Sequence, residues 1–282
     1  MIKKTRNNIS YIVLHYQTVE DTLKCIDSIK VNNDNAFIVI VDNASPNGSG
    51  KQLSQIFLND SKVKVILNET NVGFSIGNNI GCKYAIKHFN PNFLCVLNND
   101  VFIRDTGFES KVLNSYNKSE FDIMGMVVIS MSTDKNQSPI KIPANVEEIK
   151  AQIEKIEKYL QNNNSPIKYF FTRLSYKIFK KGAMSATMPL GAILIFSKKY
   201  FGKYQNVFPE YTSFYYEETL LYYRKIKDNL IVYFDNDISV DHKDGSATKA
   251  SAKEGERIKI GLKRGLDALY KVLKVFEEDL PI

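Results

Sequence analysis

The chain has 282 residues, of which 44% are hydrophobic and 24% are charged. This composition is typical of a globular protein and allows one large α/β domain or two small domains. The formal net charge of +7 suits phosphorylated ligands, nucleic acids and anionic membrane surfaces. Because the sequence carries no recognition-helix or RNA-binding signature, we expect no nucleic-acid partner.

The cysteines and the apolar runs indicate a cellular compartment. Cys25, Cys82 and Cys95 are widely spaced and form no CxxC pair, which is typical of reduced thiols in a cytosolic protein rather than of a disulfide framework. The N-terminal apolar run breaks at His15, so it is too short for the core of a signal peptide. No apolar run approaches the length of a membrane span. We therefore expect a soluble cytoplasmic protein, and peripheral contact with the inner face of the plasma membrane stays open.

Short apolar runs predict strands along most of the chain. The first four runs are almost continuously apolar, as is typical of strands that are covered on both faces. Helical patterns follow at 18–30, 73–88 and 105–116, and this β-α-β order predicts a mostly parallel, Rossmann-like sheet flanked by helices. In such sheets, ligands bind beyond the carboxyl ends of the strands. The predicted strands are 9–14, 36–41, 63–67, 93–97, 123–129, 191–196 and 230–234.

Two further segments have helical patterns of their own. Residues 143–182 begin with a capping-box signal, Asn145 with Glu148, and continue into a second helical pattern at 167–181 that is rich in Lys and Arg. The basic pattern predicts either the solvated face of an ordinary helical pair or a helix that lies on an anionic membrane. Residues 251–282 predict a C-terminal amphipathic helix packed on the domain.

Polar residues follow the second predicted strand. Asp42 and Asn43 come directly after this strand and precede a loop of Ser, Gly, Pro and Asn. A carboxylate in this position can accept hydrogen bonds from a nucleobase or a ribose hydroxyl. It can equally be the local cap of a turn, and the sequence alone leaves both interpretations open.

A glycine pattern follows the third predicted strand, where Gly73, Gly77 and Gly81 recur every four residues. A glycine costs about 1 kcal/mol in a helix interior relative to alanine, so this glycine face predicts close approach of a strand or a ligand. Asn78 and Asn79 lie near the same face. The segment contains neither GxGxxG nor a Walker loop, so a dinucleotide or ATP-motor site has no motif support.

The fourth predicted strand ends in the triplet Asn98–Asn99–Asp100. Mg²⁺ and Mn²⁺ are commonly held by one or two carboxylates together with phosphate oxygens of a substrate, and Asp100 could supply such a carboxylate. The triplet would also suit a turn or a helix N-cap. Asp235 and Asp237 form a rival carboxylate pair after another predicted strand.

Glu217 and Glu218 form an acidic pair among aromatic residues. Apolar surroundings raise the pKa of a carboxyl group, and a carboxylate with a raised pKa can act as a general base. The alternative is an acidic helix N-terminus that the helix dipole favours. His242 is either a structural histidine or a group that completes metal coordination.

The order of these motifs resembles glycosyltransferase family 2, and most closely its rhamnosyltransferase-like branch of cell-surface polysaccharide enzymes. The resemblance covers roughly residues 8–130 and 185–248. It implies a GT-A fold, a UDP- or dTDP-linked sugar donor, Mn²⁺ or Mg²⁺ as cofactor, and inversion at the anomeric carbon. The segments that carry it are YIVLHYQTVEDTLKCIDSI, IVIVDNASPNGS, NVGFSIGNNIG, FLCVLNNDV, PLGAILIFSKKYF, FYYEETLLYYR and VDHKDGSAT.

The resemblance also implies how the chain is organised. Residues 1–250 would form the catalytic domain and residues 251–282 a helical extension. Within the catalytic domain, we expect a nucleotide-binding half at about 8–130, a helical insertion at about 143–182 and an acceptor half at about 185–248.

Carried over residue by residue, the resemblance implies a role for each motif. Asn98 stands at the first position of the family's DxD motif, so Asp100 would be the retained metal ligand, with His242 near the metal or the diphosphate. In the acidic pair, Glu217 and Glu218, the second member would be the base. The donor-side residues would be Tyr16, Asp42, Asn43, Asn71, Gly73, Gly77, Asn78, Asn98 and Asn99, and the acceptor-side residues Leu190, Gly191 and Ala192.

The implied acceptor is a growing glycan, such as a lipid-linked oligosaccharide, and the sequence identifies neither the sugar nor the oligomeric state. One alternative is a nucleotidyltransferase, but residues 8–24 lack the Gly-rich, Lys- or Arg-bearing signature that this class normally has. Another alternative is a non-catalytic scaffold that binds nucleotide sugars. The presence of Asp42, Asp100, Glu218 and His242 argues against that scaffold.

Overall fold

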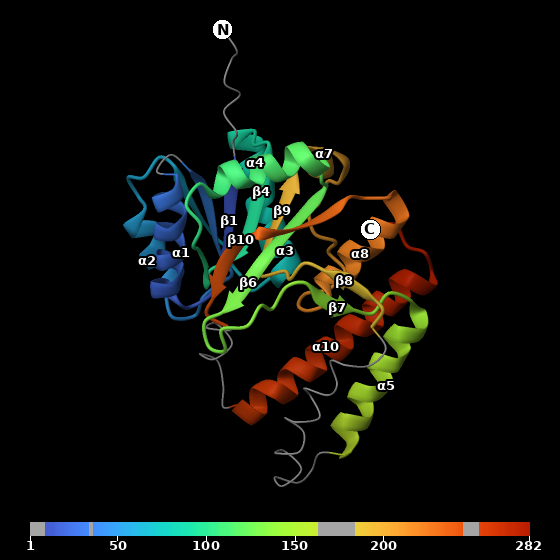
Figure 1. The fold of residues 1–282 in the computed structure, drawn as a ribbon. Helices are drawn as coiled ribbons and strands as arrows, with labels where there is room; N and C mark the ends of the chain where they lie inside the picture. Colours follow the sequence, from blue (N-terminus) through green and yellow to red (C-terminus); the bar gives the residue numbers. More distant parts are fainter. Residues whose placement is uncertain (1–8, 34–35, 163–183, 245–253) are drawn as a thin grey trace.

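An eight-stranded sheet with helices on both faces organises the molecule (Figure 1). The computed structural model describes residues 9–33, 36–162, 184–244 and 254–282. In these residues the strand order is β3-β2-β1-β4-β9-β6-β10-β5, and a separate two-stranded sheet pairs β7 with β8. The predicted α/β fold with a mostly parallel central sheet is confirmed.

The strands with continuous apolar runs form one half of the sheet. β1 (Ile9–His15), β2 (Phe37–Asp42), β3 (Val63–Leu67) and β4 (Phe93–Asn98) pair in parallel. Each begins and ends within one residue of its predicted bounds. β1, β2 and β4 are buried along nearly their whole length, which explains why these runs show no alternation of polar and apolar residues.

The other half of the sheet differs from the prediction in strand direction. β9 runs antiparallel to both β4 and β6, because it enters the sheet after a long excursion of the chain rather than through a crossover helix. β10 is parallel to β6 and antiparallel to the short β5. The bounds are β5 (Val101–Ile103), β6 (Ile123–Ser130), β7 (Ile140–Ile142), β8 (Ala186–Met188), β9 (Ile193–Ser197) and β10 (Val232–His242).

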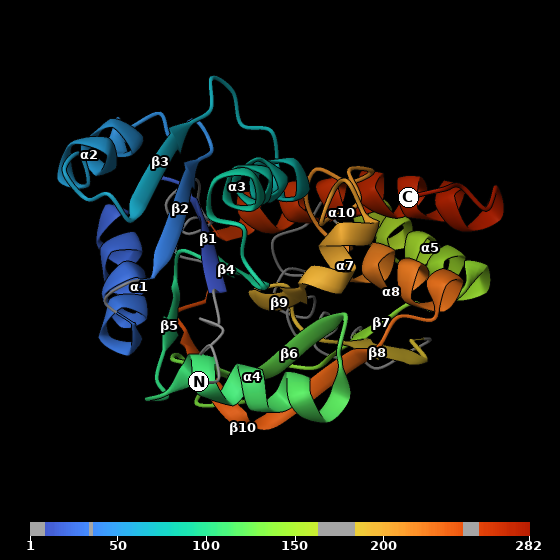
Figure 2. The ribbon, with the colours of Figure 1, turned by 90° about the horizontal axis from the view of Figure 1, so that it is seen from above.

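The sheet curls, so that its last strand returns towards its first half (Figure 2). β5 follows β4 in the chain but pairs with β10 at the far edge of the sheet. The Ile103 backbone N–H donates to Ser28 Oγ on α1 (Val19–Asn32) over 3.1 Å. The residues between β4 and β5, Asn99 and Asp100, therefore lie where the chain passes from the middle of the sheet to its β5 edge.

Helices cover both faces of the sheet. α1, α2 (Ser49–Ile56) and α4 (Phe108–Ser119) pack their apolar residues into one core cluster. α3 (Phe74–Phe89), α7 (Lys198–Lys203) and α8 (Glu217–Asp228) pack into a second cluster on the opposite face.

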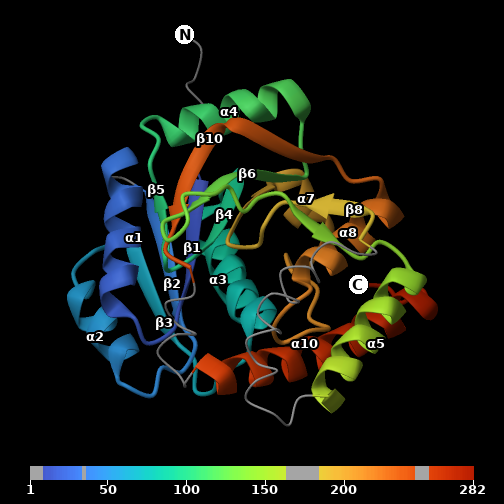
Figure 3. The ribbon, with the colours of Figure 1, turned by 60° about the horizontal axis from the view of Figure 1, so that its bottom comes forward.

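A third apolar cluster joins α8 to two long helices. α5 (Val146–Asn162) and α10 (Glu254–Glu277) lie side by side below the sheet in Figures 1 and 3. Leu220 and Tyr223 of α8 are buried together with Leu269 and Val272 of α10. The C-terminal helix packs on the rest of the chain, as the sequence predicts.

The glycine face of α3 approaches a strand rather than a ligand. A Cβ on Gly77 would lie 2.7 Å from Leu14 Cδ1, and a Cβ on Gly81 would lie 2.6 Å from Ile12 Cγ2. Real Cβ atoms do not come so close to neighbouring carbons, so these glycines allow α3 to pack directly on β1. Of the two predicted explanations, close packing on a strand is the one observed for these two residues.

Two expectations from the sequence need separate comment. Asp235 and Asp237 do not follow a strand, because β10 continues through them to His242. The basic segment 167–181 lies outside the described residues, so its proposed membrane contact stays untested. Among the described residues, we find no helix that is long and apolar enough to cross a membrane.

Candidate active site

The predicted nucleotide-side residues meet at the carboxyl ends of three neighbouring strands. In the sheet register His15 pairs with Asp42, and Leu14 pairs with Asn98. The segments that follow β1, β2 and β4 therefore start side by side. This arrangement brings together Tyr16, Asn43 and Asn99 from parts of the sequence that are far apart, as expected for a parallel sheet.

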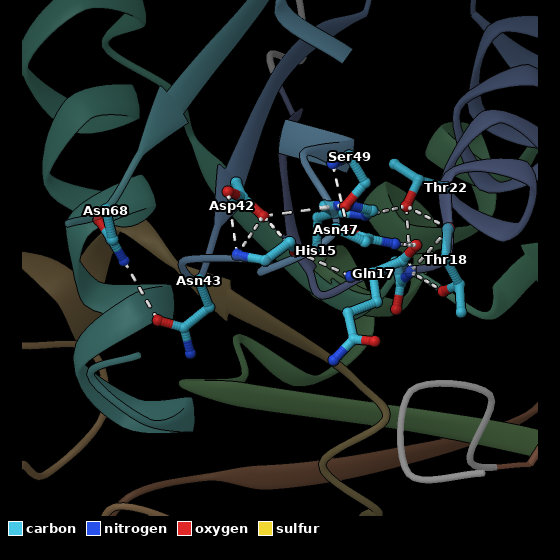
Figure 4. A network of polar contacts seen from close by, with 11 residues as sticks. His15, Gln17, Thr18, Thr22, Asp42, Asn43, Asn47, Ser49 and Asn68 are labelled. Atoms are coloured by element: carbon cyan, nitrogen blue, oxygen red, sulfur yellow. Dashed lines mark hydrogen bonds and ion pairs between the residues drawn. The ribbon is translucent and has the colours of Figure 1, made fainter. Parts of the chain in front are cut away.

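A buried histidine connects two of these segments (Figure 4). His15 Nδ1 lies 2.6 Å from Thr22 Oγ1 on α1, and His15 Nε2 lies 2.8 Å from Ser49 Oγ on α2. Burial lowers the pKa of His15 to about 4, although the nearby Asp42 carboxylate acts in the opposite direction. The neutral imidazole thus links the first turns of α1 and α2 through hydrogen bonds.

Asp42 lies against the first turn of α2. Its Oδ1 accepts a hydrogen bond of 2.5 Å from Ser45 Oγ, and a Cβ on Gly50 would come within 2.1 Å of its Oδ2. Only glycine leaves room for the carboxylate at this helix N-terminus, where the helix dipole favours a negative charge. Asp42 is thus both a turn residue and a buried carboxylate at the strand edge.

Tyr16 begins the loop after β1. Its carbonyl accepts a hydrogen bond from Thr18 N, and the next residue, Gln17, donates its backbone N–H to Ser45 Oγ over 2.8 Å. Asn47 Nδ2 donates to the Gln17 carbonyl over 2.9 Å (Figure 4). The two loops that would border a nucleotide base are thus fixed to each other.

The donor and acceptor atoms of the Asn43 side chain both have hydrogen-bond partners within the protein. Its Nδ2 donates to Asn71 Oδ1 and to the Gly73 carbonyl, each over 3.0 Å. Its Oδ1 accepts from Val72 N and from Asn68 Nδ2. Because both donors and both lone pairs of this amide have partners, Asn43 shapes the loop before α3 instead of offering a free group to a ligand.

The start of α3 is shaped by the same loop. Gly73 has φ of 85°, and a Cβ there would lie 2.3 Å from the Ser213 carbonyl oxygen, so a glycine is required. The Phe74 N–H donates to that carbonyl over 2.6 Å. Asn78 Nδ2 donates to the Phe74 carbonyl, whereas its buried Oδ1 has no hydrogen-bond partner.

The three residues of the triplet after β4 make different contacts. The Asn98 backbone N–H donates to the Ala192 carbonyl over 2.9 Å, next to β9. Asn99 Nδ2 donates to Thr18 Oγ1 and Thr22 Oγ1 over 2.8 and 3.0 Å, which holds the turn against α1. Asp100 is buried at the start of β5, facing the end of β10. A turn and a buried carboxylate therefore coexist in the triplet.

Asp100 faces His242, as the resemblance implies. His242 Nε2 lies 3.4 Å from Asp100 Oδ1, and His242 Nδ1 lies 2.8 Å from Gln137 Oε1. Gln137 Nε2 donates to Asp244 Oδ1 over 2.6 Å, so the amide oxygen of Gln137 must face the histidine. Since an amide oxygen only accepts, Nδ1 carries a hydrogen, and Nε2 is the ring atom that faces Asp100.

This donor set fits a divalent cation. Two acceptors that face each other in a buried position need a cation between them, either a proton or a metal ion. A metal-binding histidine commonly donates its other N–H to an amide or a carboxylate, as His242 does to Gln137. Within the described residues no group of three or more His, Cys, Asp or Glu side chains could hold a metal alone. Asp100 and His242 would therefore form a partial ligand set that phosphate oxygens complete.

Sequence reasoning missed Gln137 and Asp244, which orient His242. Burial acts to raise the pKa of Asp244, but hydrogen bonds from Ser130, Ser132 and Gln137 outweigh burial and lower it. Asp244 lies two residues after His242 within a recognised motif, so spacing could have suggested it. Gln137 lies in a loop between β6 and β7, and no sequence pattern marks it.

The candidate base lies beside the acceptor-side loop. Glu218 Oε1 accepts a hydrogen bond of 2.8 Å from the Gly191 backbone N–H, and a Cβ on Gly191 would lie equally close to this oxygen. The neighbouring Leu190 N–H donates to Ser138 Oγ over 3.0 Å. Ala192 in turn accepts from Asn98, so β9 connects the acidic pair to the end of β4. The structure thus brings together both predicted groups.

Both glutamates have raised pKa values. Burial, assisted by the Glu218 charge, raises the pKa of Glu217 to about 8. Burial also raises the pKa of Glu218, although the Gly191 N–H favours its charged form. Among the described residues, Glu217 Oε1 is buried and has no hydrogen-bond partner. The contact with the acceptor-side loop, through Gly191, is made by Glu218.

A strained turn leads into this acidic pair. Tyr215 and Tyr216 have φ values of 71° and 64°, which are unfavourable for aromatic residues. Each such residue costs roughly 1 to 3 kcal/mol and persists only where its surroundings hold it in place. Glu217 and Glu218 then form the first turn of α8. Strain and raised pKa values in one place are typical of a functional site.

The rival acidic pair lies elsewhere. Asp235 is half-way along β10, opposite Met126 of β6, and accepts hydrogen bonds from Ser115 Oγ on α4 and from Asp237 N. It therefore lies away from the carboxyl ends of the strands and packs against a helix.

Comparison with solved structures agrees with this fold. The crystal structure of residues 1–349 of TarS from S. aureus has a TM-score of 0.53 and 14% identity, and the match covers 98% of this chain and 75% of that chain. Its complex with UDP-GlcNAc has a TM-score of 0.55 at 14% identity and covers 96% and 71%. Its complex with UDP has a TM-score of 0.53 at 12% identity and covers 97% and 92%. At such identities the likeness shows the fold alone.

The family is shown by the sequence. No curated protein matches the chain significantly, but the family model described as glycosyl transferase family 2 matches residues 10–186, more than half of the chain. The curled, mostly parallel sheet with helices on both faces is consistent with the GT-A fold of that family. The chain belongs to glycosyl transferase family 2.

Proposed function

We propose that this chain is an inverting, metal-dependent transferase that moves a sugar from a UDP- or dTDP-linked donor to a hydroxyl of a growing cell-surface glycan. The observation that carries the proposal is the hydrogen bond of 2.8 Å between Gly191 N and Glu218 Oε1. One residue further, Ala192 O accepts from Asn98 N over 2.9 Å. These contacts bring a candidate base beside the strand end where a diphosphate would bind.

In this proposal the nucleotide lies over the ends of β1, β2 and β4. Asp42 and Tyr16 border the base and the ribose, and the Asn43 network holds the loop before α3 in the shape that receives the donor. The structural neighbour TarS has been crystallised with UDP-GlcNAc and with UDP. That neighbour supports a uridine donor, whereas the rhamnosyltransferase-like motifs support a dTDP-linked one.

Asp100 and His242 would hold Mn²⁺ or Mg²⁺ together with the phosphates. A cation there would neutralise the charge that grows on the diphosphate as the glycosidic bond breaks. Lys243 lies beside the same site, since its N–H donates to the Asp100 carbonyl and its Nζ lies 2.6 Å from Asp21 Oδ1. Lys243 therefore connects the segment after β10 both to Asp100 and to α1.

Glu218 is the proposed base. Its carboxylate takes the proton from the acceptor hydroxyl, whose oxygen attacks the anomeric carbon from the face opposite to the diphosphate. The bond between the anomeric carbon and the phosphate oxygen breaks, and the nucleoside diphosphate leaves with that electron pair. One displacement inverts the anomeric carbon, so a second carboxylate nucleophile is not needed. Burial raises the pKa of Glu217, so this neighbour favours the neutral form.

The acceptor that we propose is a glycan such as a lipid-linked oligosaccharide. Leu190, Gly191 and Ala192 would border it, because they adjoin Glu218 on the side away from β1 and β2. Contact of the enzyme with an anionic membrane through 167–181 would bring it to a lipid-linked acceptor at the inner face of the plasma membrane. Deletion of this segment should then lower binding to anionic vesicles without changing the affinity for UDP.

A product assay tests the proposed function. The full chain is incubated with Mn²⁺ and, separately, with UDP-GlcNAc, UDP-glucose, UDP-galactose and dTDP-rhamnose, and release of UDP or dTDP is measured with water as acceptor. We expect release from at least one donor. A folded sample that binds a nucleotide sugar and never releases the diphosphate would favour a non-catalytic scaffold. Release of pyrophosphate from a nucleoside triphosphate would favour a nucleotidyltransferase.

A further inference from the structure

The turn that carries the acidic pair has an unusual backbone conformation. Tyr215 and Tyr216 both have positive φ, a conformation that glycine or asparagine adopts far more readily. The first turn of α8 follows at once, and its direction sets where Glu217 and Glu218 point. Residues in such conformations persist where their surroundings hold them in place, so the contacts of these aromatic rings with other elements matter for the acidic pair.

One face of α10 meets the aromatic turn, Phe214–Tyr216. The Tyr215 hydroxyl lies 3.4 Å from the position of a Cβ on Gly261, and Tyr216 Cε2 lies 3.8 Å from that of a Cβ on Gly265. Arg264 Cζ lies 5.1 Å from the centre of the Phe214 ring. Positions 261, 264 and 265 share a face of a helix, because residues three and four apart are neighbours there. Three successive aromatic rings are thus matched by three positions on α10.

Further contacts join α10 and the C-terminus to α8 and the loop before it. Tyr223 OH donates to Asp279 Oδ1 over 2.5 Å, and Arg224 Nε donates to the Ile282 carbonyl over 3.2 Å. Tyr211 OH donates to the Pro281 carbonyl over 3.0 Å. Gly261 and Gly265 face the two strained tyrosines at ordinary contact distances, which leave room for a Cβ but not for a large side chain.

We infer that α10 positions the catalytic acidic pair, and that Gly261, Arg264 and Gly265 are the positioning residues that hold the aromatic turn against its strain. This inference rests on the proposed function for the role of Glu218 as a base. The C-terminal helix is then part of the catalytic apparatus, although none of its residues touches the reacting groups. The bond between Glu218 and Gly191 depends on it.

Gly265→Leu tests the inference directly. The distances leave room for a single Cβ, so Gly265→Ala fits the space, whereas the larger leucine has to displace the Tyr216 ring. Hydrogen exchange of the full chain, followed by mass spectrometry on peptides that span 211–221, reports on the turn without any substrate. We expect exchange there to be at least tenfold faster in Gly265→Leu and unchanged in Gly265→Ala.

Two further variants separate positioning from general loss of stability. Val275→Ala removes a buried methyl pair from α10 about 15 Å along the helix from Gly265, and it should leave exchange at 214–218 unchanged. Arg264→Ala removes only the exposed cation above Phe214 and should accelerate exchange about threefold. Arg264→Ala also serves if the leucine variant does not fold.

Turnover then tests the catalytic half of the inference. With the donor that the product assay identifies, Gly265→Leu should lower kcat at least tenfold, leave KM for the donor within twofold, and move the acid limb of the pH–rate profile to lower pH as water reaches the glutamates. Unchanged exchange at 214–218 in both Gly265→Leu and Arg264→Ala would overturn the inference, whether or not the wild type turns over. Absence of wild-type turnover would instead overturn the proposed function, and the exchange data would still decide whether α10 holds the turn.

Discussion

The nucleotide side and the acceptor side of the site differ in which polar groups are left unsatisfied. On the nucleotide side, His15, Asn43 and Asn99 use their side chains in hydrogen bonds within the protein, although Asn78 Oδ1 is buried without a partner among the described residues. On the acceptor side, a titratable group, Glu217, has a buried oxygen without a partner among the same residues, as has Thr219 Oγ1. An unsatisfied buried group costs free energy, and a buried carboxyl costs more when it is charged. The comparison indicates a hydrogen-bonded nucleotide side beside an acceptor side that holds the strained turn and the buried acidic pair, where we propose that the chemistry takes place.

Removal of the base should produce the largest effect. Glu218→Gln keeps the shape of the side chain but cannot take a proton, so we expect kcat to fall about 1,000-fold, in the range of general-base loss. The affinity for UDP should stay within twofold, because the nucleotide side does not depend on this group. Glu147→Gln, an exposed change at the start of α5, is the control. Retention of most of the turnover by Glu218→Gln would show that another group is the base.

The second prediction concerns stability on the strained side. The pKa of Glu217 is about 8 in the folded chain and near 4.5 when unfolded. Between these values the unfolded chain releases a proton that the folded chain retains, so stability falls as pH rises through this window. Glu217→Gln cannot ionise, so its free energy of unfolding should not fall in this window. The difference in free energy of unfolding between the variant and the wild type should therefore grow by an amount on the order of 3 kcal/mol from pH 5 to pH 9. Urea unfolding of both proteins at pH 5 and pH 9 measures this difference. An equal difference at the two pH values would contradict the raised pKa of Glu217.

The third prediction concerns the metal ligand. Asp100→Asn keeps the size of the side chain and removes its charge, so we expect kcat/KM to fall about 100-fold and the effect of Mn²⁺ on UDP affinity to disappear. Asp235→Asn, which removes a carboxylate away from the strand ends, should leave the Mn²⁺ effect in place. If both variants responded to Mn²⁺ like the wild type, the metal would lie elsewhere.

The smallest effect is expected in the Asn43 network. Asn43→Asp replaces an N–H₂ that donates to Asn71 and Gly73 with an oxygen that repels both acceptors. We expect a loss of roughly 2 kcal/mol in the free energy of unfolding, measured in urea, and weaker UDP binding. Asn114→Asp, exposed on α4, should cost far less. Equal losses in the two variants would mean that the nucleotide side is less rigid than the hydrogen bonds indicate.

Much of the nucleotide side could be predicted from the sequence because strand ends are local features. Continuous apolar runs end at Asp42 and Asn98, and a parallel sheet brings such ends together. The sequence did not reveal that Asn43 is saturated by the loop before α3. Its partners, Asn71 and Gly73, are about thirty residues away, and the glycine pattern that includes Gly73 does not show which side chains the loop binds.

The acceptor side was less predictable because it depends on contacts between distant segments. β9 is antiparallel and β5 crosses to the far edge of the sheet, and neither is visible in a run of three to five residues. The sequence left Glu217 and Glu218 hard to distinguish, whereas the N–H of Gly191 distinguishes them. No sequence pattern shows that Gly261 and Gly265 of the C-terminal helix face the rings of Tyr215 and Tyr216.

Calorimetric titration of the wild-type chain with UDP, with and without Mn²⁺, tests the central claim most directly. The claim is that the ends of β1, β2 and β4 form a ready-made nucleotide site beside Asp100 and His242. We predict saturable binding that is at least tenfold tighter with Mn²⁺. A folded sample that binds neither UDP nor dTDP under either condition would contradict the account.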